Sequence, residues 1–266
     1  MRINSSTATT SDLFSIPSER LRLDKDEVHI WRCDLDQPTS VRQGLIATLA
    51  EDERAKAARF YFDKDRNHFI VARGTLRAIL GYYLNLNPAG LRFCYGEYGK
   101  PMLARELHGE SLRFNLSHSD GLALVAVTRG REIGVDLEKI RPGMPDEGIA
   151  ERFFSTGEVR ALHELPRHQQ DEGFFNCWTR KEAYIKAKGE GLSMPLSEFE
   201  VSLAPGESAA LLSTKRDPHE AARWSMRELF PALGFVAAVV VEGSGWQLRC
   251  LQWSEQWSHT ASDGSM

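Results

Sequence analysis

The chain has 266 residues, 42% of them hydrophobic, which is enough for one large domain or two small ones. Its formal net charge of −4 argues against nucleic acid as a partner, because a broad nucleic-acid footprint needs an excess of basic residues. No apolar run approaches the length of a transmembrane helix, and the Ser/Thr-rich start lacks the apolar core of a signal peptide. We therefore expect a soluble, cytoplasmic protein with no membrane partner and with reduced thiols at its scattered cysteines, Cys33, Cys94, Cys177 and Cys250.

In chain order, apolar alternation first predicts a strand at 27–35, and helical periodicity follows from Glu51 to Leu84. The stretch "LRFCYGEYGKPML" (91–103) is typical of two strands joined by a Gly-rich turn, and "LALVAVT" (122–128) is typical of a buried strand. The later elements are predicted as a strand at 132–140, helices at 149–165 and 171–188, a strand at 199–203, a loop over most of 204–220, and strands at 224–229, 234–243 and 246–253.

A weak internal repeat suggests that the chain is built twice. "ARFYF" (58–62) resembles "ERFFS" (151–155), and "GLALVAVTRG" (121–130) resembles "GFVAAVVVEG" (234–243), in the same order. Chance similarity between apolar strands is an equal explanation. If the repeat is real, the fold is α+β with two similar lobes, and a site between them is expected. The predicted organisation is a tail at 1–22, lobes at 23–131 and 132–253, and a tail at 254–266.

Two carboxylates end one predicted strand. Asp136 and Glu138 in "GVDLEK" lie two apart, so they point to the same side of a strand. Adjacent carboxylates repel each other unless a cation lies between them, and magnesium suits such a pair because phosphate oxygens and water complete its shell. The alternative is a solvated strand end beside Lys139.

The helix "CWTRKEAYIKAKGEGL" (177–192) supplies a third carboxylate. Glu182 and Lys186 lie four apart on one face. With Lys181 they could offer a metal ligand and cations for phosphate oxygens. The alternative is a surface helix with an ion pair.

Two further segments carry candidate anion ligands. "NLSHSDG" (115–121) is predicted as a turn in which Ser117 and His118 could bind a phosphate; an exposed ST-type turn is an equal alternative, and a nucleophilic Ser–His pair lacks the G-x-S-x-G elbow. "GEYGKP" (96–101) places Lys100 in a Gly-rich turn that is not a Walker loop, and taken alone this motif favours a plain hairpin turn. Basic residues of the first helical region could reach an anion or form a solvated face.

Taken together, "GEYGKP", "FNLSHS", "IGVDLE", "RFFSTGE" and "WTRKEAYIKAKGEGL" resemble the Sfp-type 4′-phosphopantetheinyl transferases in order and spacing. The similarity runs from about Val28 to Gly245. The N-terminal strand, the "RFYF" segment and the "GFVAAVVV" strand are most similar to the cyanobacterial branch. The resemblance implies two pseudo-twofold α+β lobes with coenzyme A and Mg²⁺ bound between them.

The resemblance also implies roles for matching residues. Asp136, Glu138 and Glu182 would be the metal-binding acids, and Lys186 would contact the phosphates and protonate the leaving group. The cofactor-binding set would be Lys56, Arg59, Arg73, Tyr98, Gly99, Lys100, Ser117 and His118, together with Asp136 and Lys186. One position departs from the family: Glu53 stands where Sfp-type enzymes have a second lysine, which leaves Arg54, Arg59 or Arg73 as substitutes.

The implied activity is that of a holo-[acyl-carrier-protein] synthase. It transfers 4′-phosphopantetheine from coenzyme A to a serine of an apo acyl or peptidyl carrier protein and releases 3′,5′-ADP. The proton acceptor is Glu182, Glu138 or a metal-bound water, with Glu182 favoured. A magnesium-dependent hydrolase of coenzyme A or nucleotide phosphates is the alternative enzyme, and a carrier- or coenzyme A-binding module is the non-enzymatic one. We expect a monomer.

Overall fold

The computed structural model describes residues 14–17, 21–107, 112–143 and 147–255. Its helices are α1 (Thr39–Thr48), α2 (Glu51–Ala57), α3 (Asp63–Leu84), α4 (Glu147–Phe153), α5 (Thr156–Glu164) and α6 (Arg167–Lys188). Its strands are β1 (Glu27–Asp34), β2 (Phe93–Tyr95), β3 (Pro101–Leu103), β4 (Leu112–Ser119), β5 (Leu122–Arg129), β6 (Ile133–Lys139), β7 (Phe199–Val201), β8 (Leu211–Thr214), β9 (Trp224–Leu229), β10 (Phe235–Glu242) and β11 (Gln247–Gln252). Short 3₁₀ turns connect several of them. Among the described residues, no helix is long and apolar enough to cross a membrane.

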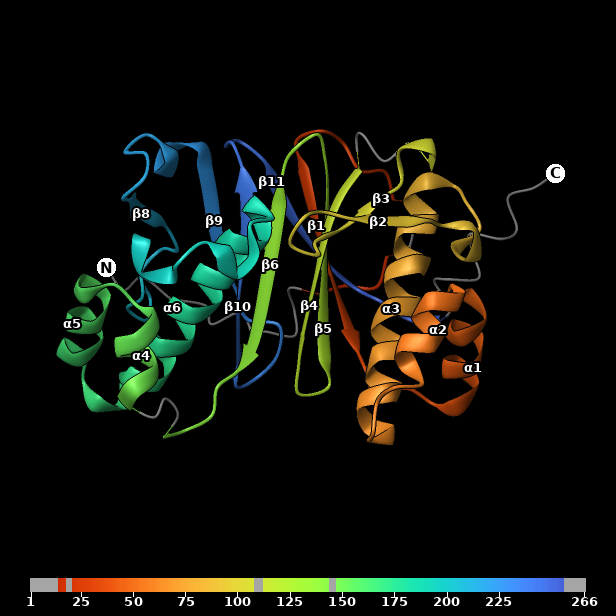
Figure 1. Cartoon of the computed structure of the whole chain (residues 1–266), viewed down its shortest axis with the longest axis horizontal. Helices are drawn as coiled ribbons and strands as arrows, with labels where there is room; N and C mark the ends of the chain where they lie inside the picture. The colour runs from red at the N-terminus through yellow and green to blue at the C-terminus, as the bar shows by residue number, and fades with distance from the viewer. Residues whose placement is uncertain (1–13, 18–20, 108–111, 144–146, 256–266) are drawn as a thin grey trace, which may run out of the picture.

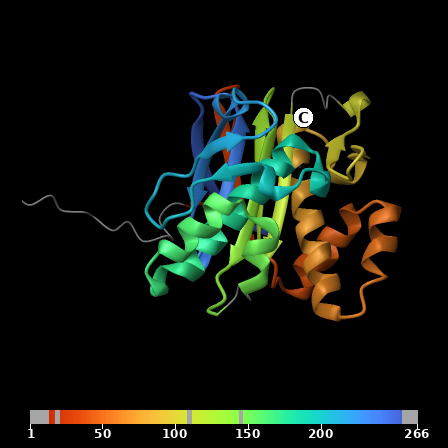
Figure 2. The ribbon, with the colours of Figure 1, turned by 60° about the vertical axis from the view of Figure 1, so that its left-hand side comes forward.

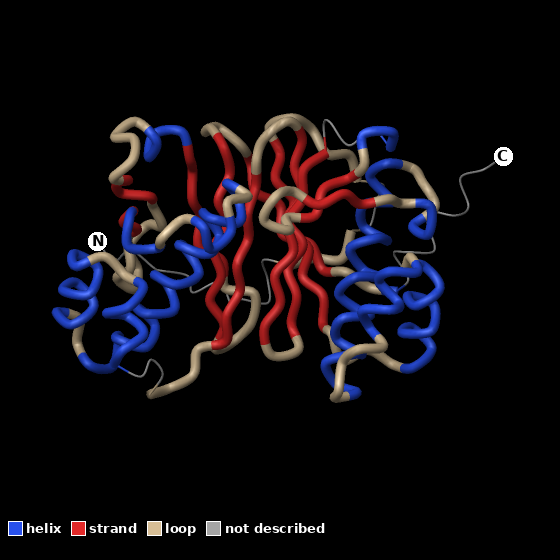
Figure 3. Tube along the Cα trace, in the orientation of Figure 1, coloured by secondary structure: helices blue, strands red, loops and turns tan. Residues whose placement is uncertain are grey.

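Two sheets lie side by side between two groups of helices. The larger sheet has the strand order β11-β1-β5-β4, and the smaller has the order β6-β10-β9. Helices α1–α3 cover the outer side of the larger sheet, and α4–α6 cover the outer side of the smaller one (Figure 1). The turned view separates the two helical groups in the same way (Figure 2). The tube view shows the strands between helices at the two flanks (Figure 3).

The two lobes repeat one topology. Each runs strand, helices, short hairpin, then two strands: β1, α1–α3, β2–β3, β4 and β5 in the first, and β6, α4–α6, β7–β8, β9 and β10 in the second. In each lobe the last strand is central and pairs antiparallel with both others. The expected α+β fold with two similar lobes is confirmed.

The central strands are apolar throughout because both faces of each sheet are buried. Between the two sheets, Ile133, Val135 and Leu137 of β6 share a core with Val28 and Ile30 of β1. The other faces of the two sheets form separate cores with α3 and with α6. Because successive side chains point to opposite faces, Gly134, Asp136 and Glu138 of β6 are directed to the α6 side.

The element boundaries differ from the expectations in several places. The predicted helix 51–84 is two helices, because 58–62 forms a turn, and 149–165 is likewise α4 plus α5. The expected loop 204–220 contains β8, and "NLSHS" (115–119) ends β4 instead of forming a turn. "ARFYF" directly precedes the long helix α3, whereas α5 separates "ERFFS" from α6, so only the strand pair of the proposed repeat is equivalent.

The first and last segments that the structure describes join the larger sheet. β11 pairs in parallel with β1, so the last strand belongs to the sheet of the first lobe. Phe14 is buried, and Ser15 forms a bridge with Leu251. The expected tails otherwise lie outside the described residues, apart from 21–22 and 254–255.

Candidate active site

The catalytic helix candidate, α6, lies directly on β6. A Cβ built on Gly134 would be 2.1 Å from the Ala183 carbonyl oxygen and 2.4 Å from the Ala187 nitrogen. Only glycine therefore permits this approach. The close contact brings the face of α6 that carries Glu182 and Lys186 over Asp136, which lies two residues farther along β6.

Two serines on β4 match the two carboxylates on β6. Ser117 Oγ donates to Asp136 Oδ1 at 2.9 Å, and Ser119 Oγ donates to Glu138 Oε2 at 2.9 Å. One rung earlier, Asn115 Oδ1 accepts from the Val135 amide at 2.9 Å. The predicted turn at 115–121 is thus a strand end, and its S-x-S spacing has the same period of two as D-x-E. β4 belongs to the first lobe and β6 to the second, so the site lies between the lobes.

We call the line of contacts between Ser117 and Ser119 of β4 and Asp136 and Glu138 of β6 the β4–β6 seam. Lys186 reaches this seam from α6. Its Nζ donates to Asp136 Oδ1 at 2.5 Å and to Ser117 Oγ at 3.1 Å. Asp136 is 3% exposed, so its carboxylate is held by a charge-assisted contact at low solvent exposure. The structure therefore brings together Ser117, Asp136 and Lys186, which the sequence placed in three separate motifs.

The acidic side chains of the site shift one another's titration. Burial, followed by the charge of Asp136, raises the pKa of Glu182 to about 7, with Glu138 adding to the effect and Lys186 opposing it. Burial and the charge of Asp136 also raise the pKa of Glu138. Desolvation and the nearby charge of Lys186 lower the pKa of His118, although the residue is exposed overall. The site therefore combines three acidic side chains with the ammonium group of Lys186.

The donor atoms suit a hard cation. Asp136 Oδ2 is buried and has no hydrogen-bond partner, an arrangement that is costly unless a ligand satisfies the oxygen. Within the described residues, no three His, Cys, Asp or Glu side chains are close enough to form a ready-made metal cage. Magnesium does not need one, because it takes one or two carboxylates and completes its shell with water and phosphate. The residues present fit a magnesium ion that binds together with its substrate.

The neighbouring lysine of the motif is structural. Lys181 is fully buried, and its Nζ contacts the carbonyl oxygens of Leu196 (2.7 Å) and Phe199 (2.6 Å) and Glu158 Oε2 (2.7 Å). With all three ammonium hydrogens used, Lys181 fixes α6 to the second lobe. The suggestion that it serves phosphate oxygens was wrong. Trp178 supports the same helix by packing on Phe153.

The basic residues of the first helical region differ in their solvent exposure. Lys56 and Arg59 are exposed. Arg73 is buried, and its guanidinium pairs with Glu53, whose other oxygen accepts from Arg77 Nε at 2.6 Å. Only Nε of Arg73 contacts Glu53, and its Nη2 group donates to the Tyr95 hydroxyl at 3.3 Å. Glu53, the departure from the family pattern, therefore pairs with two buried arginines.

The hairpin turn lies against the C-terminal end of α6. Gly99 has φ +81°, and a Cβ built on Gly191 would be 3.1 Å from Tyr98 Cβ. Lys100 donates to three protein oxygens, including the Ala187 carbonyl at 2.9 Å. Tyr98 is exposed at this edge.

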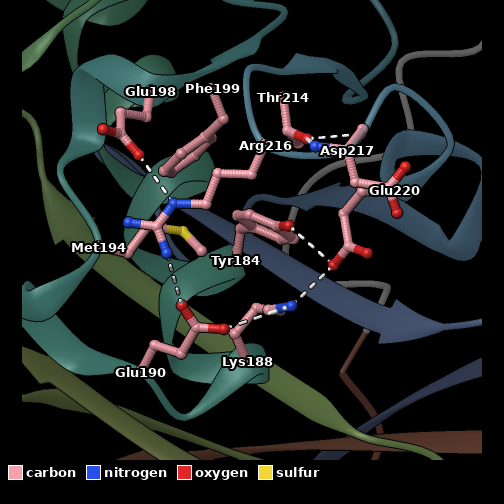
Figure 4. A pocket seen from close by; sticks show the side chains of 10 residues that line it. All are labelled: Tyr184, Lys188, Glu190, Met194, Glu198, Phe199, Thr214, Arg216, Asp217 and Glu220. Carbon is pink, nitrogen blue, oxygen red and sulfur yellow. Dashed lines mark hydrogen bonds and ion pairs between the residues drawn. The ribbon is translucent and has the colours of Figure 1, made fainter.

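A hollow on the opposite side of α6 is a different site (Figure 4). Tyr184 and Lys188 line it, and they lie two residues from Glu182 and Lys186, about 200° around the helix. Its charges pair internally: Lys188 Nζ is 2.9 Å from Glu220 Oε1, and Arg216 Nε is 2.9 Å from an oxygen of Glu198. The hollow therefore takes no part in the β4–β6 seam.

Sequence reasoning missed Gly134 and Asn115, and it placed Ser119 in a phosphate-binding turn and not beside Glu138. The two serines carried a usable signal, because S-x-S and D-x-E share the strand period. Gly134 carried none, since only the packed helix shows why a side chain is excluded there.

Comparison with known proteins gives a consistent family. Residues 31–129 match the model described as "4′-phosphopantetheinyl transferase, N-terminal", and residues 132–240 match the 4′-phosphopantetheinyl transferase superfamily. The chain is 48% identical over 227 residues to 4′-phosphopantetheinyl transferase HetI of Nostoc sp., covering 85% of this chain and 92% of that protein. It is 36% identical to a 4′-phosphopantetheinyl transferase of Bacillus subtilis and 32% identical to Sfp of strain 168, each over 65% of this chain and 76% of the relative. The resemblance to Sfp-type enzymes of the cyanobacterial branch is confirmed.

Proposed function

This chain belongs to the 4′-phosphopantetheinyl transferase superfamily, and we propose that it transfers the phosphopantetheine group of coenzyme A to a serine of an apo acyl or peptidyl carrier protein. The observation that carries the proposal is the meeting of Asp136, Ser117 and Lys186 at the seam between the lobes. An acid that is held by a cation and still has one unpaired oxygen suits a phosphate ester and its metal. We further propose that the protein acts as a cytoplasmic monomer.

Coenzyme A would lie along this seam with its pyrophosphate at Lys186. Two of the three Lys186 ammonium hydrogens have protein acceptors, which leaves one to donate to a phosphate oxygen. His118, exposed at the end of β4, would bind the 3′-phosphate side, whereas Ser117 already donates its only hydroxyl hydrogen to Asp136. Tyr98 and Gly99 would line the nucleotide pocket, and the exposed Lys56 and Arg59 would contribute long-range attraction for the phosphates.

Asp136 would hold a magnesium ion together with Glu138 or Glu182, since magnesium takes one or two protein carboxylates. When bound, the ion would neutralise pyrophosphate oxygens and relieve the mutual repulsion that raises the pKa values of Glu138 and Glu182. The buried Oδ2 of Asp136 is its first ligand in this proposal, because it has no other partner.

The transfer step then needs one base and one acid. The carrier serine oxygen forms a bond to the β-phosphorus of coenzyme A, the bond from that phosphorus to the bridging oxygen breaks, and 3′,5′-ADP leaves. Glu182 accepts the serine proton, and Lys186 donates to the leaving phosphate as negative charge grows on it. Glu182 suits this role because no hydrogen bond of the described residues occupies its carboxylate, and Lys186 lies one helical turn away.

Intact mass of an apo carrier protein tests the proposal. The carrier is incubated with the chain, coenzyme A and Mg²⁺, and a gain of one phosphopantetheinyl unit is expected. EDTA and Glu182→Ala should both abolish the gain. Coenzyme A consumed without carrier modification would indicate a hydrolase instead, and neither change would indicate a binding module.

A further inference from the structure

Lys100 is attached to both lobes. It follows the turn of the β2–β3 hairpin in the first lobe, and its side chain is 13% exposed. Its Nζ donates to the Ala187 carbonyl at 2.9 Å, the Ile133 carbonyl at 3.2 Å and Glu132 Oε2 at 3.0 Å. An ammonium group has three hydrogens, so these contacts use them all.

The three acceptors lie in α6 and at the start of β6, two of the three elements that form the site. Ala187 follows Lys186 in the last turn of α6, where carbonyl groups lack partners within the helix and cations are favoured. Glu132 and Ile133 lead into β6, three residues before Asp136. One ammonium group therefore fixes the end of α6 to the start of β6, close to both partners of the Lys186–Asp136 contact.

The same side chain fixes the hairpin turn against α6. A Cβ built on Gly189 would be 3.2 Å from Lys100 Cδ, and one built on Gly191 would be 3.1 Å from Tyr98 Cβ. These distances are at the tight end of normal packing, so the hairpin and the end of the helix fit closely. A change at Lys100 is therefore transmitted to the hairpin turn and to Lys186 together.

We propose that Lys100 is a positioning residue for the transfer reaction: it holds the last turn of α6 so that Lys186 meets Asp136, and it does not itself bind a phosphate. The inference rests on the proposed function, since its readout is the transfer rate. Shifts of about 1 Å in a reacting group can cost about 100-fold in rate, so a loosened helix end is measurable.

Lys100→Met is the main variant, and Lys188→Met is its matched control. Lys188 lies in the same turn of α6, pairs with Glu190 and Glu220, and faces away from the seam. For Lys100→Met we expect kcat to fall about 10- to 100-fold, while the Kd for coenzyme A from calorimetry changes less than about threefold. For Lys188→Met we expect kcat within about twofold of the unmodified chain.

Lys100→Arg separates positioning from phosphate binding, and it keeps the test valid if the methionine variant does not fold. Arginine is a strong phosphate ligand, but its planar fork cannot place three hydrogens on the oxygens that one ammonium nitrogen contacts. Positioning predicts a lowered kcat with coenzyme A affinity retained. A rise in Kd of tenfold or more in Lys100→Met that Lys100→Arg restores would overturn the inference. So would a lowered melting temperature with unchanged kcat. If the unmodified chain transfers nothing, the proposed function fails rather than this inference.

Discussion

Ser117 donates a 2.9 Å hydrogen bond to Asp136, and this bond joins β4 in one lobe to β6 in the other. Lys186 closes the triangle from α6, with contacts to both residues. Three elements from two lobes thus fix one carboxylate. The site exists only when the lobes are packed together. Activity and stability must therefore both be measured for each variant, to separate damage to the site from damage to the fold.

Asp136→Asn should lower kcat at least about 100-fold with the fold retained. The amide is nearly isosteric, but it removes the charge that Lys186 contacts and the hard ligand proposed for magnesium. The measurement is the rate of carrier modification at saturating coenzyme A, together with a melting curve. Asp120→Asn is the control: Asp120 pairs with Lys139 on the surface and has φ +43°, a conformation that asparagine tolerates. A mutant at 136 with activity like the control would contradict the assignment.

Gly134→Ala should destabilise the chain by roughly 2–3 kcal/mol and reduce transfer, because the added methyl group would meet the α6 backbone. The backbone there cannot move without displacing Glu182 and Lys186. Urea denaturation and the transfer rate are measured together. Gly44→Ala is the control, since a Cβ there meets nothing within 4 Å and alanine in a helix interior gains about 0.5–1 kcal/mol. Equal behaviour of the two variants would mean that α6 does not lie on β6 as described.

Glu53→Gln should cost about 3–5 kcal/mol of unfolding free energy, because it leaves Arg73 and Arg77 buried without a counter-charge. Burial alone would raise the pKa of Glu53, but hydrogen bonds from Arg77 and Ala50 and the charge of Arg73 lower it. At low temperature, the KM for coenzyme A should stay within about threefold. The exposed Glu51→Gln should change stability by less than about 0.5 kcal/mol. An unchanged stability with a large rise in KM would place this cluster in the nucleotide site instead.

His29 should make stability depend on pH. It is completely buried beside Tyr83, and burial lowers the pKa of His29 from 6.5 to about 4 although Glu27 opposes the shift. The unfolded chain binds a proton near pH 6.5 and the folded chain only near pH 4. The contribution of neutral His29 is therefore complete above pH 6.5 and is lost as pH falls towards 4.

Over that window we expect a loss of about 3 kcal/mol from this residue. Denaturation at several pH values compares the chain with His29→Asn, which should lack this part of the pH slope. The exposed His163→Asn should keep the slope. A His29→Asn profile parallel to that of the unmodified chain would show that His29 titrates normally.

Local patterns predicted much of the fold. Continuous apolar runs located β5 and β10, and Asn85, which has φ +54°, ends α3 where the helical pattern stopped. Ser117–Ser119 were misjudged because Asn, Ser, Asp and Gly favour turns, whereas pairing with Leu122–Leu124 of β5 extends the strand. Tertiary pairing outweighed local preference there.

The remaining errors concern contacts between distant residues. From the sequence, Lys181 is interpreted as a surface cation. In the structure its ammonium group is enclosed by Glu158 and two carbonyl groups. From the sequence, Glu53 is interpreted as the loss of a family lysine. In the structure it forms ion pairs with Arg73 and Arg77 of α3. β11 follows the second lobe in sequence, yet it pairs with β1 of the first. No local pattern contains these pairings.

The transferase assignment is tested by measuring two products in one reaction with coenzyme A and Mg²⁺: released 3′,5′-ADP and modified carrier protein. If Asp136, Lys186 and Glu182 form a transferase site, one 3′,5′-ADP should appear for each carrier modified. None should appear without carrier, and both products should disappear together in Asp136→Asn. Release of 3′,5′-ADP without carrier modification, or carrier modification that survives in Asp136→Asn, would contradict the account.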